Sequence, residues 1–122
     1  MEKLVFLFIL AFAGAEVVYF ITGNDNLDVD PIIGNVTLLQ TYVDCFLDKG
    51  PCSELQESYK RNMVESVEGI CNRCSPSQKK MFRRFLDGLK KVLPKEYEKF
   101  KLKYDPKNQY FDALEEELAK FI

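Results

Sequence analysis

The sequence predicts an all-α protein, a single domain of about six helices joined by short turns. Apolar residues recur at helical spacing over most of the chain, and no alternating β-branched run is long enough for a strand. Four cysteines follow the spacing C-x6-C-x18-C-x2-C, which favours two short local loops. Loops this short clip neighbouring turns at about 2–2.5 kcal/mol each, so the fold must come mainly from apolar packing.

The first fifteen residues look like a secretory signal peptide. Lys3 precedes an unbroken apolar run over residues 4–15, and Ala13-Gly14-Ala15 fits the small-x-small cleavage rule. The alternative is a membrane anchor that continues through residues 17–21, but Glu16 interrupts that span and no basic cluster follows. We therefore expect residues 1–15 to be a signal peptide and residues 16–122 to form one secreted domain.

Two helices are expected in the first part of that domain. Asp30-Pro31 suits the start of a short helix that ends before Gly34-Asn35. The next helix ends at Lys49-Gly50-Pro51, a strong stop signal. Its apolar stripe consists of Leu38, Leu39, Tyr42, Val43, Phe46 and Leu47.

The middle of the chain predicts two longer helices, each opened by a serine. Ser53 caps a segment whose apolar face continues to Cys71, through Leu55, Tyr59, Met63, Val67 and Ile70. Ser75-Pro76 opens a second helix, with proline at its first position. This helix has the clearest stripe, formed by Met81, Phe82, Phe85, Leu86, Leu89, Val92 and Leu93.

Two further helices are expected after Pro94. The first has a shorter apolar edge at Tyr97, Phe100 and Tyr104 and ends at Asp105-Pro106. The last covers residues 108–121. Its apolar residues are Tyr110, Phe111, Leu114, Leu118 and Phe121.

Residue types that carry catalysis are scarce. The chain has no histidine, which removes the commonest general base and metal ligand, and its net charge of −2 does not support a nucleic-acid partner. Four cysteines allow three pairings, and Cys71-Asn72-Arg73-Cys74 taken alone can be a redox motif, half a zinc site or a structural clip. The structural clip is favoured because no strand precedes the motif and the chain is expected to be secreted.

Other features have a functional and an ordinary interpretation. Aromatic stripes at helical spacing are usually core, yet tyrosines within them can face an apolar space and offer a hydroxyl to a ligand. The basic run at Lys79-Lys80 and Arg83-Arg84 is usually a solvated face, although it can also meet anionic lipid. Asn35-Val36-Thr37 is an N-glycosylation sequon, so Asn35 is a candidate glycosylation site.

Several segments resemble the insect chemosensory proteins, also called the OS-D or pheromone-binding A10-like family. The stretch from Tyr42 to Cys52, YVDCFLDKGPC, is the most specific of them. The same pattern is matched by Cys71-x-x-Cys74-Ser75, by Pro94-Lys95-Glu96-Tyr97, by Lys103-Tyr104-Asp105-Pro106, and by Asn26 to Asp30 together with Ile33. The resemblance covers essentially the whole chain after the signal peptide.

The resemblance implies six helices around an apolar channel, disulfides between Cys45 and Cys52 and between Cys71 and Cys74, and binding of fatty-acid-like chains and semiochemicals. It also implies that Tyr42 is a channel tyrosine, and it places Tyr97 where many relatives carry tryptophan. The chain also differs from the family pattern in a shorter segment after Cys52 and in an acidic tail. The candidates for the ligand-binding lining are Ile33, Leu39, Tyr42, Val43, Phe46, Met63, Val67, Ile70, Phe82, Phe85, Leu86, Leu89 and Tyr97.

The leading hypothesis is therefore a secreted, monomeric carrier of small hydrophobic molecules that has no cofactor, metal, nucleic-acid partner or stable membrane insertion. Its receptor, if it meets one, is not named by the sequence. The alternative is a secreted helical interaction protein with a developmental or other non-sensory role and no transported ligand. An enzyme that uses Cys71 and Cys74 is the weakest hypothesis.

Overall fold

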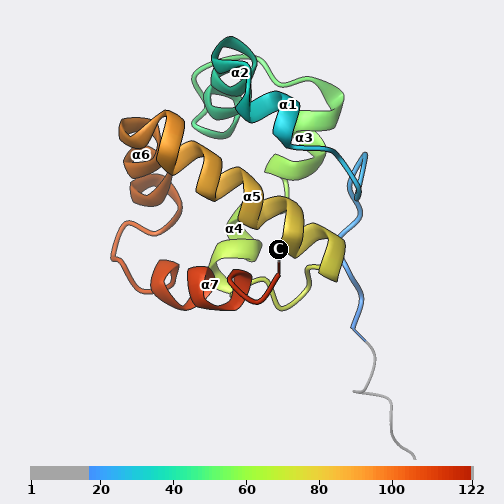
Figure 1. Cartoon of the computed structure of the whole chain (residues 1–122). Coiled ribbons are helices and arrows are strands. Elements are labelled where there is room, and N and C mark those ends of the chain that lie inside the picture. Colours follow the sequence, from blue (N-terminus) through green and yellow to red (C-terminus); the bar gives the residue numbers. More distant parts are fainter. Residues whose placement is uncertain (1–16, 122) are drawn as a thin grey trace, which may run out of the picture.

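The computed structural model describes residues 17–121 of the chain. The expected signal peptide, residues 1–15, lies outside the described residues. Within this range the backbone forms helices and no strand, which confirms the all-α prediction. The helices are α1 (Asp30–Ile33), α2 (Val36–Phe46), α3 (Glu54–Lys60), α4 (Met63–Glu68), α5 (Pro76–Val92), α6 (Pro94–Tyr104) and α7 (Phe111–Leu118) (Figure 1).

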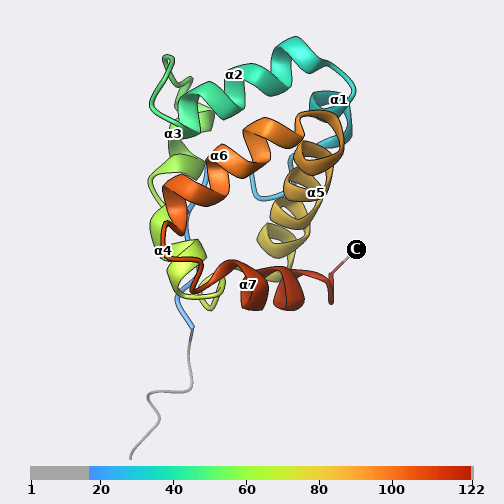
Figure 2. The same cartoon turned by 90° about the vertical axis from the view of Figure 1, so that its left-hand side faces the viewer.

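Helix α5 is the centre of the bundle. It contacts α6, α7 and the single turn of α1, while α2 packs on α1, α3 and α6 (Figures 1 and 2). Its close approach to α1 depends on Gly88, because a Cβ there would lie 2.3 Å from Cδ1 of Ile33. None of the helices in residues 17–121 is long and apolar enough to cross a bilayer.

The predicted serine caps are present. Ser53 and Ser75 each accept a hydrogen bond from the backbone N–H three residues later, and the side chains of the glutamines there, Gln56 and Gln78, accept one from the serine N–H. Asn35 caps α2 by accepting from the N–H of Leu38. The caps explain why these helices begin where the sequence predicts.

Two predicted helices differ in the structure. The segment expected to run from Ser53 to Cys71 is divided into α3 and α4, because Asn62 sits between them and its side-chain amide donates to the carbonyl of Ser58 at 3.2 Å. Helix α7 begins at Phe111 rather than near Asn108. The preceding backbone N–H groups are bound by a side chain instead of joining a helix.

That side chain is the buried carboxylate of Asp105. It accepts from the backbone N–H groups of Gln109, Tyr110 and Phe111 at 2.8–2.9 Å. Burial alone would raise the pKa of Asp105, but these three bonds and the Lys101 ammonium lower it below the usual range. The turn predicted at Asp105-Pro106 is thus fixed by a charged hydrogen-bond acceptor.

Both local disulfides are formed, between Cys45 and Cys52 and between Cys71 and Cys74. The pairing expected from the spacing and from the resemblance is confirmed. Both cysteines of the C-x-x-C motif are joined to each other, which is the arrangement that a structural clip requires.

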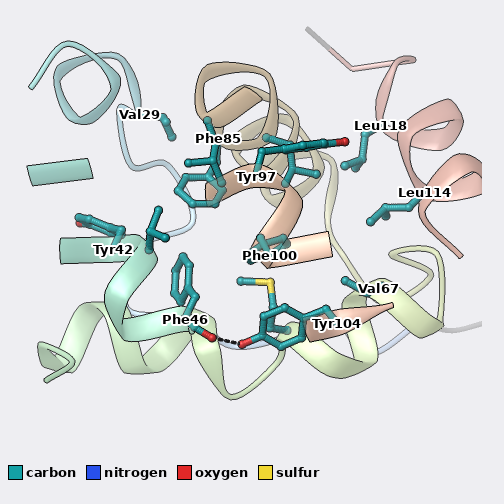
Figure 3. Close-up of a cluster of buried hydrophobic side chains, with 14 of the residues drawn as sticks. Val29, Tyr42, Phe46, Val67, Phe85, Tyr97, Phe100, Tyr104, Leu114 and Leu118 are labelled. Carbon is teal, nitrogen blue, oxygen red and sulfur yellow. Dashed lines mark hydrogen bonds between the residues drawn. The ribbon is translucent and has the colours of Figure 1, made fainter. Parts of the chain in front are cut away.

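The packed side of the bundle is the region where α5, α6 and α7 meet. Its central side chains are at most 1% exposed and comprise Leu89, Phe100, Phe111, Leu114 and Leu118. Phe100 lies among other rings, 6.1 Å from Phe111 and 4.9 Å from Tyr104, whose hydroxyl donates to the carbonyl of Phe46 (Figure 3). Not every stripe residue is buried, since Leu38 and Val92 are 38% and 36% exposed.

Candidate functional site: an apolar cavity beside α5

An apolar cavity of about 100 Å³ lies beside the first half of α5, next to the packed side. Its walls come from the extended N-terminal segment, from α1 to α4 and from the first half of α5. The lining residues are Phe20, Thr22, Leu27, Val29, Ile32, Tyr42, Phe46, Tyr59, Asn62, Met63, Ser66, Cys74, Gln78, Met81, Phe82 and Phe85.

The apolar wall is built from rings and methionines. Phe46 packs edge to face on Phe85 at 5.6 Å and on Tyr42 at 6.2 Å (Figure 3). Met63 and Met81 face the same space from α4 and α5, and their unbranched thioether chains can adapt to an irregular guest. This wall suits an apolar molecule, and its described residues include no nucleophile with an activating base.

A small number of polar groups also reach the cavity. Tyr59 donates its hydroxyl to the carbonyl of Asn24 at 2.6 Å, and burial raises the pKa of Tyr59 to about 12. Ser66 donates to the carbonyl of Asn62 at 2.8 Å, so its proton is already used. Both hydroxyls therefore bind backbone carbonyls and hold the wall together.

Tyr42 differs from them. Its side chain is 8% exposed, and burial raises the pKa of Tyr42 above the usual value, which keeps the phenol neutral. Its hydroxyl has no hydrogen-bond partner among residues 17–121. A buried hydroxyl without a partner is destabilising, so Tyr42 has a donor available for a ligand.

The candidate ligand-binding residues are divided between the cavity and the rest of the core. Five of them line the cavity, namely Tyr42, Phe46, Met63, Phe82 and Phe85. Of the remaining eight, Leu39, Val43, Val67, Leu86 and Leu89 are fully buried elsewhere. Ile33 packs against Gly88, and Ile70 lies in the turn before Cys71 at a positive φ of 55°.

Tyr97 also lies away from the cavity, on the packed side. Its ring is 6.1 Å from that of Phe111, and its hydroxyl donates to the Glu115 carboxylate at 2.5 Å. Burial and the hydrogen bond to Glu115 both raise the pKa of Tyr97. The position at which Tyr97 replaces the tryptophan of many relatives therefore lies in the core rather than in the cavity wall.

Helical periodicity does not identify the part of the lining that comes from the N-terminal segment. Phe20, Thr22, Leu27 and Val29 come from a region without such periodicity, and the apolar residues at 17–21 enter the sequence interpretation only as a continuation of a membrane anchor. No local signal singles out Phe20, because it lies within the apolar run of residues 17–21.

Comparison with known proteins places this geometry in a family. Residues 20–112 match the insect pheromone-binding family A10/OS-D. The chain belongs to this family. The match confirms the resemblance drawn from the cysteine pattern, and it includes every residue that lines the cavity.

Two curated relatives of the A10/OS-D family are similar over most of the chain. Allergen Tha p 1 from Thaumetopoea pityocampa is 30% identical, and the match covers 77% of this chain and 75% of the allergen. Ejaculatory bulb-specific protein 3 from Drosophila melanogaster is 29% identical over 75% of this chain and 72% of its own.

Solved structures share the fold. A chemosensory protein in complex with bromo-dodecanol superposes with a TM-score of 0.69 at 29% identity, covering 75% of this chain and 92% of the other. The antennal chemosensory protein A6 from the moth Mamestra brassicae gives 0.66 at 26% identity, over 77% of this chain and 92% of its own.

Proposed function

We propose that this chain is a secreted, monomeric carrier that takes up a small hydrophobic molecule, such as a fatty-acid-like chain or a semiochemical, in the cavity beside α5. The apolar cavity is the observation that carries the proposal. Family membership supports it, as does the relative with a TM-score of 0.69 whose structure contains bromo-dodecanol. The proposal assigns no catalytic role and no cofactor.

The chemistry of the wall favours a straight-chain ligand with one polar end. The alkyl part would contact the rings and methionines, and the polar end would accept a hydrogen bond from Tyr42. Of the candidate ligand contacts, we keep Tyr42, Phe46, Met63, Phe82 and Phe85 in this role. Seven of the other eight contribute to the core, and Ile70 lies in the turn before Cys71. Asn35 is exposed and remains a candidate for glycosylation.

The expected affinity is modest. A twelve-carbon chain gains about 10 kcal/mol at about 0.8 kcal/mol per methylene, and association removes about 4 kcal/mol or more. The remaining ~6 kcal/mol corresponds to a Kd of about tens of micromolar. A carrier with this affinity would accept a range of apolar guests rather than a single one.

Displacement of a fluorescent fatty-acid probe tests the proposal. Dodecanol should displace the probe saturably from the protein. Met81→Lys, which puts a charge into the cavity wall, should abolish displacement, whereas Val92→Lys at an exposed position of the same helix should leave it unchanged. If no long-chain ligand displaces the probe, the carrier role fails and a ligand-free interaction protein becomes the better account.

A further inference from the structure

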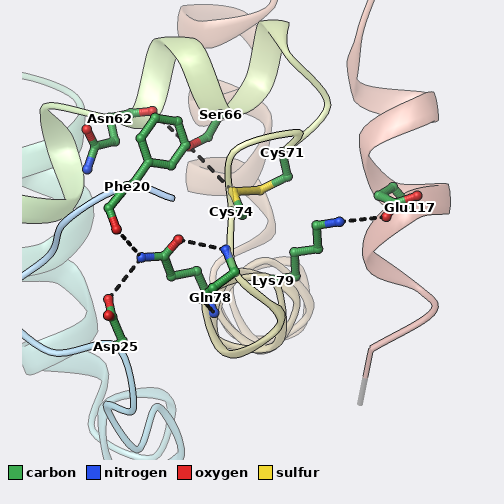
Figure 4. The surroundings of a disulfide bond; sticks show 10 residues. Phe20, Asp25, Asn62, Ser66, Cys71, Cys74, Gln78, Lys79 and Glu117 are labelled. Carbon is green, nitrogen blue, oxygen red and sulfur yellow. Dashed lines mark hydrogen bonds and ion pairs between the residues drawn. A yellow bond between two sulfur atoms is a disulfide. The ribbon is translucent and has the colours of Figure 1, made fainter. Parts of the chain in front are cut away.

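The cavity is closed on one side by an extended segment, residues 18–24, which we call the strap. Its backbone is held mainly by side chains of the bundle. The carbonyl of Phe20 accepts from Nε2 of Gln78 at 2.7 Å (Figure 4). The N–H of Gly23 donates to the hydroxyl of Ser58 at 2.8 Å. A backbone pairing joins the N–H of Phe20 to the carbonyl of Arg73 at 3.0 Å.

Phe20 is the strap residue that enters the protein. Its side chain is 7% exposed and lines the cavity, whereas the flanking Tyr19 and Ile21 are 48% and 84% exposed. The Arg73 guanidinium lies 4.8 Å from the centre of the Phe20 ring, and its Nε donates to the carbonyl of Val18 at 2.9 Å. Arg73 therefore binds the strap through its own backbone carbonyl and through its guanidinium.

The loop that carries Arg73 is held in place by a disulfide and by an ion pair. Arg73 lies in the tight loop closed by the disulfide between Cys71 and Cys74, and Glu65 of α4 binds its guanidinium at 2.9 Å. Cys74 itself lines the cavity beside Phe20 (Figure 4). The strap is thus the movable partner and the disulfide loop is the fixed one.

The cavity is too small for a long alkyl chain while Phe20 occupies its place. An apolar cavity of about 150 Å³ holds one benzene molecule, so about 100 Å³ cannot hold a twelve-carbon chain. Part of the wall must move. The helical walls pack on further helices, whereas the strap is not helical and its outer side chains face solvent.

We infer that Phe20 is a displaceable plug, and that its departure with the strap makes room for the outer part of a long alkyl chain. This inference rests on the proposed carrier function and goes beyond it by naming the residue that sets the chain length. If about 150 Å³ holds the six carbons of benzene, about 100 Å³ holds about four carbons, so a short alcohol such as butanol fits without moving Phe20. Long ligands bind only after the ring has been transferred to water.

A chain-length series measures the effect. The protein is expressed with its own leader and secreted, and Kd values for butanol and tetradecanol are measured by probe displacement. Phe20→Ala should raise the affinity for tetradecanol roughly 10- to 100-fold, since burial of a phenylalanine no longer opposes binding, and should change that for butanol by less than about threefold. Tyr19→Ala removes an exposed ring from the same strap and should change neither value.

A tryptophan reporter tests displacement without weakening the fold. The chain contains no tryptophan, so Phe20→Trp gives a single emitting site. Tetradecanol should shift its emission to longer wavelength and butanol should not, while Tyr110→Trp, outside the cavity lining, should respond to neither.

The outcomes separate the two proposals. Absence of saturable binding of either alcohol by the unmodified protein overturns the carrier function. Two results overturn the plug alone. One is saturable binding of tetradecanol by the Phe20→Trp variant with no shift in its emission, and the other is an equal gain in affinity for both alcohols in Phe20→Ala.

Discussion

The packed side of the bundle and the cavity side use the same kinds of residue to different ends. The packed side buries Phe100, Phe111 and Leu114 almost completely, with exposures of 0–1%. On the cavity side the rings of Phe20, Tyr42 and Phe85 are 7–8% exposed and border a space of about 100 Å³. The rings of the packed side are enclosed by other side chains, whereas a ring such as Phe85 packs on Phe46 and Phe100 and also borders the cavity.

This contrast suggests a division of labour. Close packing on one side supplies the dispersion and hydrophobic free energy that holds the fold. The other side gives up contacts and keeps a hydroxyl that no group in residues 17–121 binds, and these features lower stability but make room for a guest. Mutations on the two sides should therefore affect different quantities.

The largest difference should come from deleting one ring on each side. Phe100→Ala removes a fully buried ring and should lower the free energy of unfolding by about 3–5 kcal/mol. Phe82→Ala removes a half-buried ring from the cavity wall and should cost about 1–2 kcal/mol, because part of its surroundings is already empty. Urea denaturation measures both, and equal losses would contradict the distinction.

The two disulfides should separate stability from binding. Replacing either pair by serine should lower the free energy of unfolding by about 2 kcal/mol, since both close short loops. Only the Cys71→Ser/Cys74→Ser variant should also change ligand affinity, because that loop carries Arg73 and Cys74 borders the cavity. An equal change in affinity for the Cys45→Ser/Cys52→Ser variant would refute this assignment.

A smaller effect is expected at Tyr42. Tyr42→Phe should leave the free energy of unfolding unchanged or slightly raised, because it removes a buried hydroxyl that lacks a partner in the described part of the chain. It should weaken dodecanol binding about fivefold, the equivalent of one hydrogen bond of about 1 kcal/mol, and leave binding of dodecane unchanged. Calorimetric titration with both ligands checks the prediction.

The smallest effect is expected in the loss of stability at acid pH. Hydrogen bonds from Lys120 and Lys79 lower the pKa of Glu117 on the packed side from 4.5 to about 2. A lowered folded-state pKa stabilises the fold above pH 4.5, and that contribution is lost as the pH falls from 4.5 towards 2.

Denaturation across this pH range should therefore show a shallower loss of stability for Glu117→Gln than for the unmodified protein. The exposed neighbour Glu116→Gln serves as the matched control. If the two variants share one acid profile, the ion pairs of Glu117 contribute nothing measurable.

The sequence predicted the helices better than the site. Periodicity located α2, and periodicity together with the cap of Ser75 located α5, because both signals are local. The break at Asn62 was missed because a polar side chain that bonds a nearby carbonyl interrupts a helix without disturbing the apolar stripe.

The cavity lining was harder to predict for a physical reason. A stripe identifies the buried face of a helix, but it does not say whether that face meets side chains or empty space. Leu86 and Phe85 are neighbours on one stripe, yet Leu86 is fully buried in the core and Phe85 borders the cavity. Phe20 could not be found by periodicity at all, because it belongs to no helix.

The central claim, that an alkyl chain binds in the cavity, is tested most directly through the methionines. The chain has three, and beyond Met1 both Met63 and Met81 line the cavity. In protein labelled with ¹³C at the methionine methyl groups, titration with dodecanol should shift both methyl resonances along one saturable curve. Saturable binding of dodecanol with both resonances unmoved would place the ligand elsewhere and contradict the account.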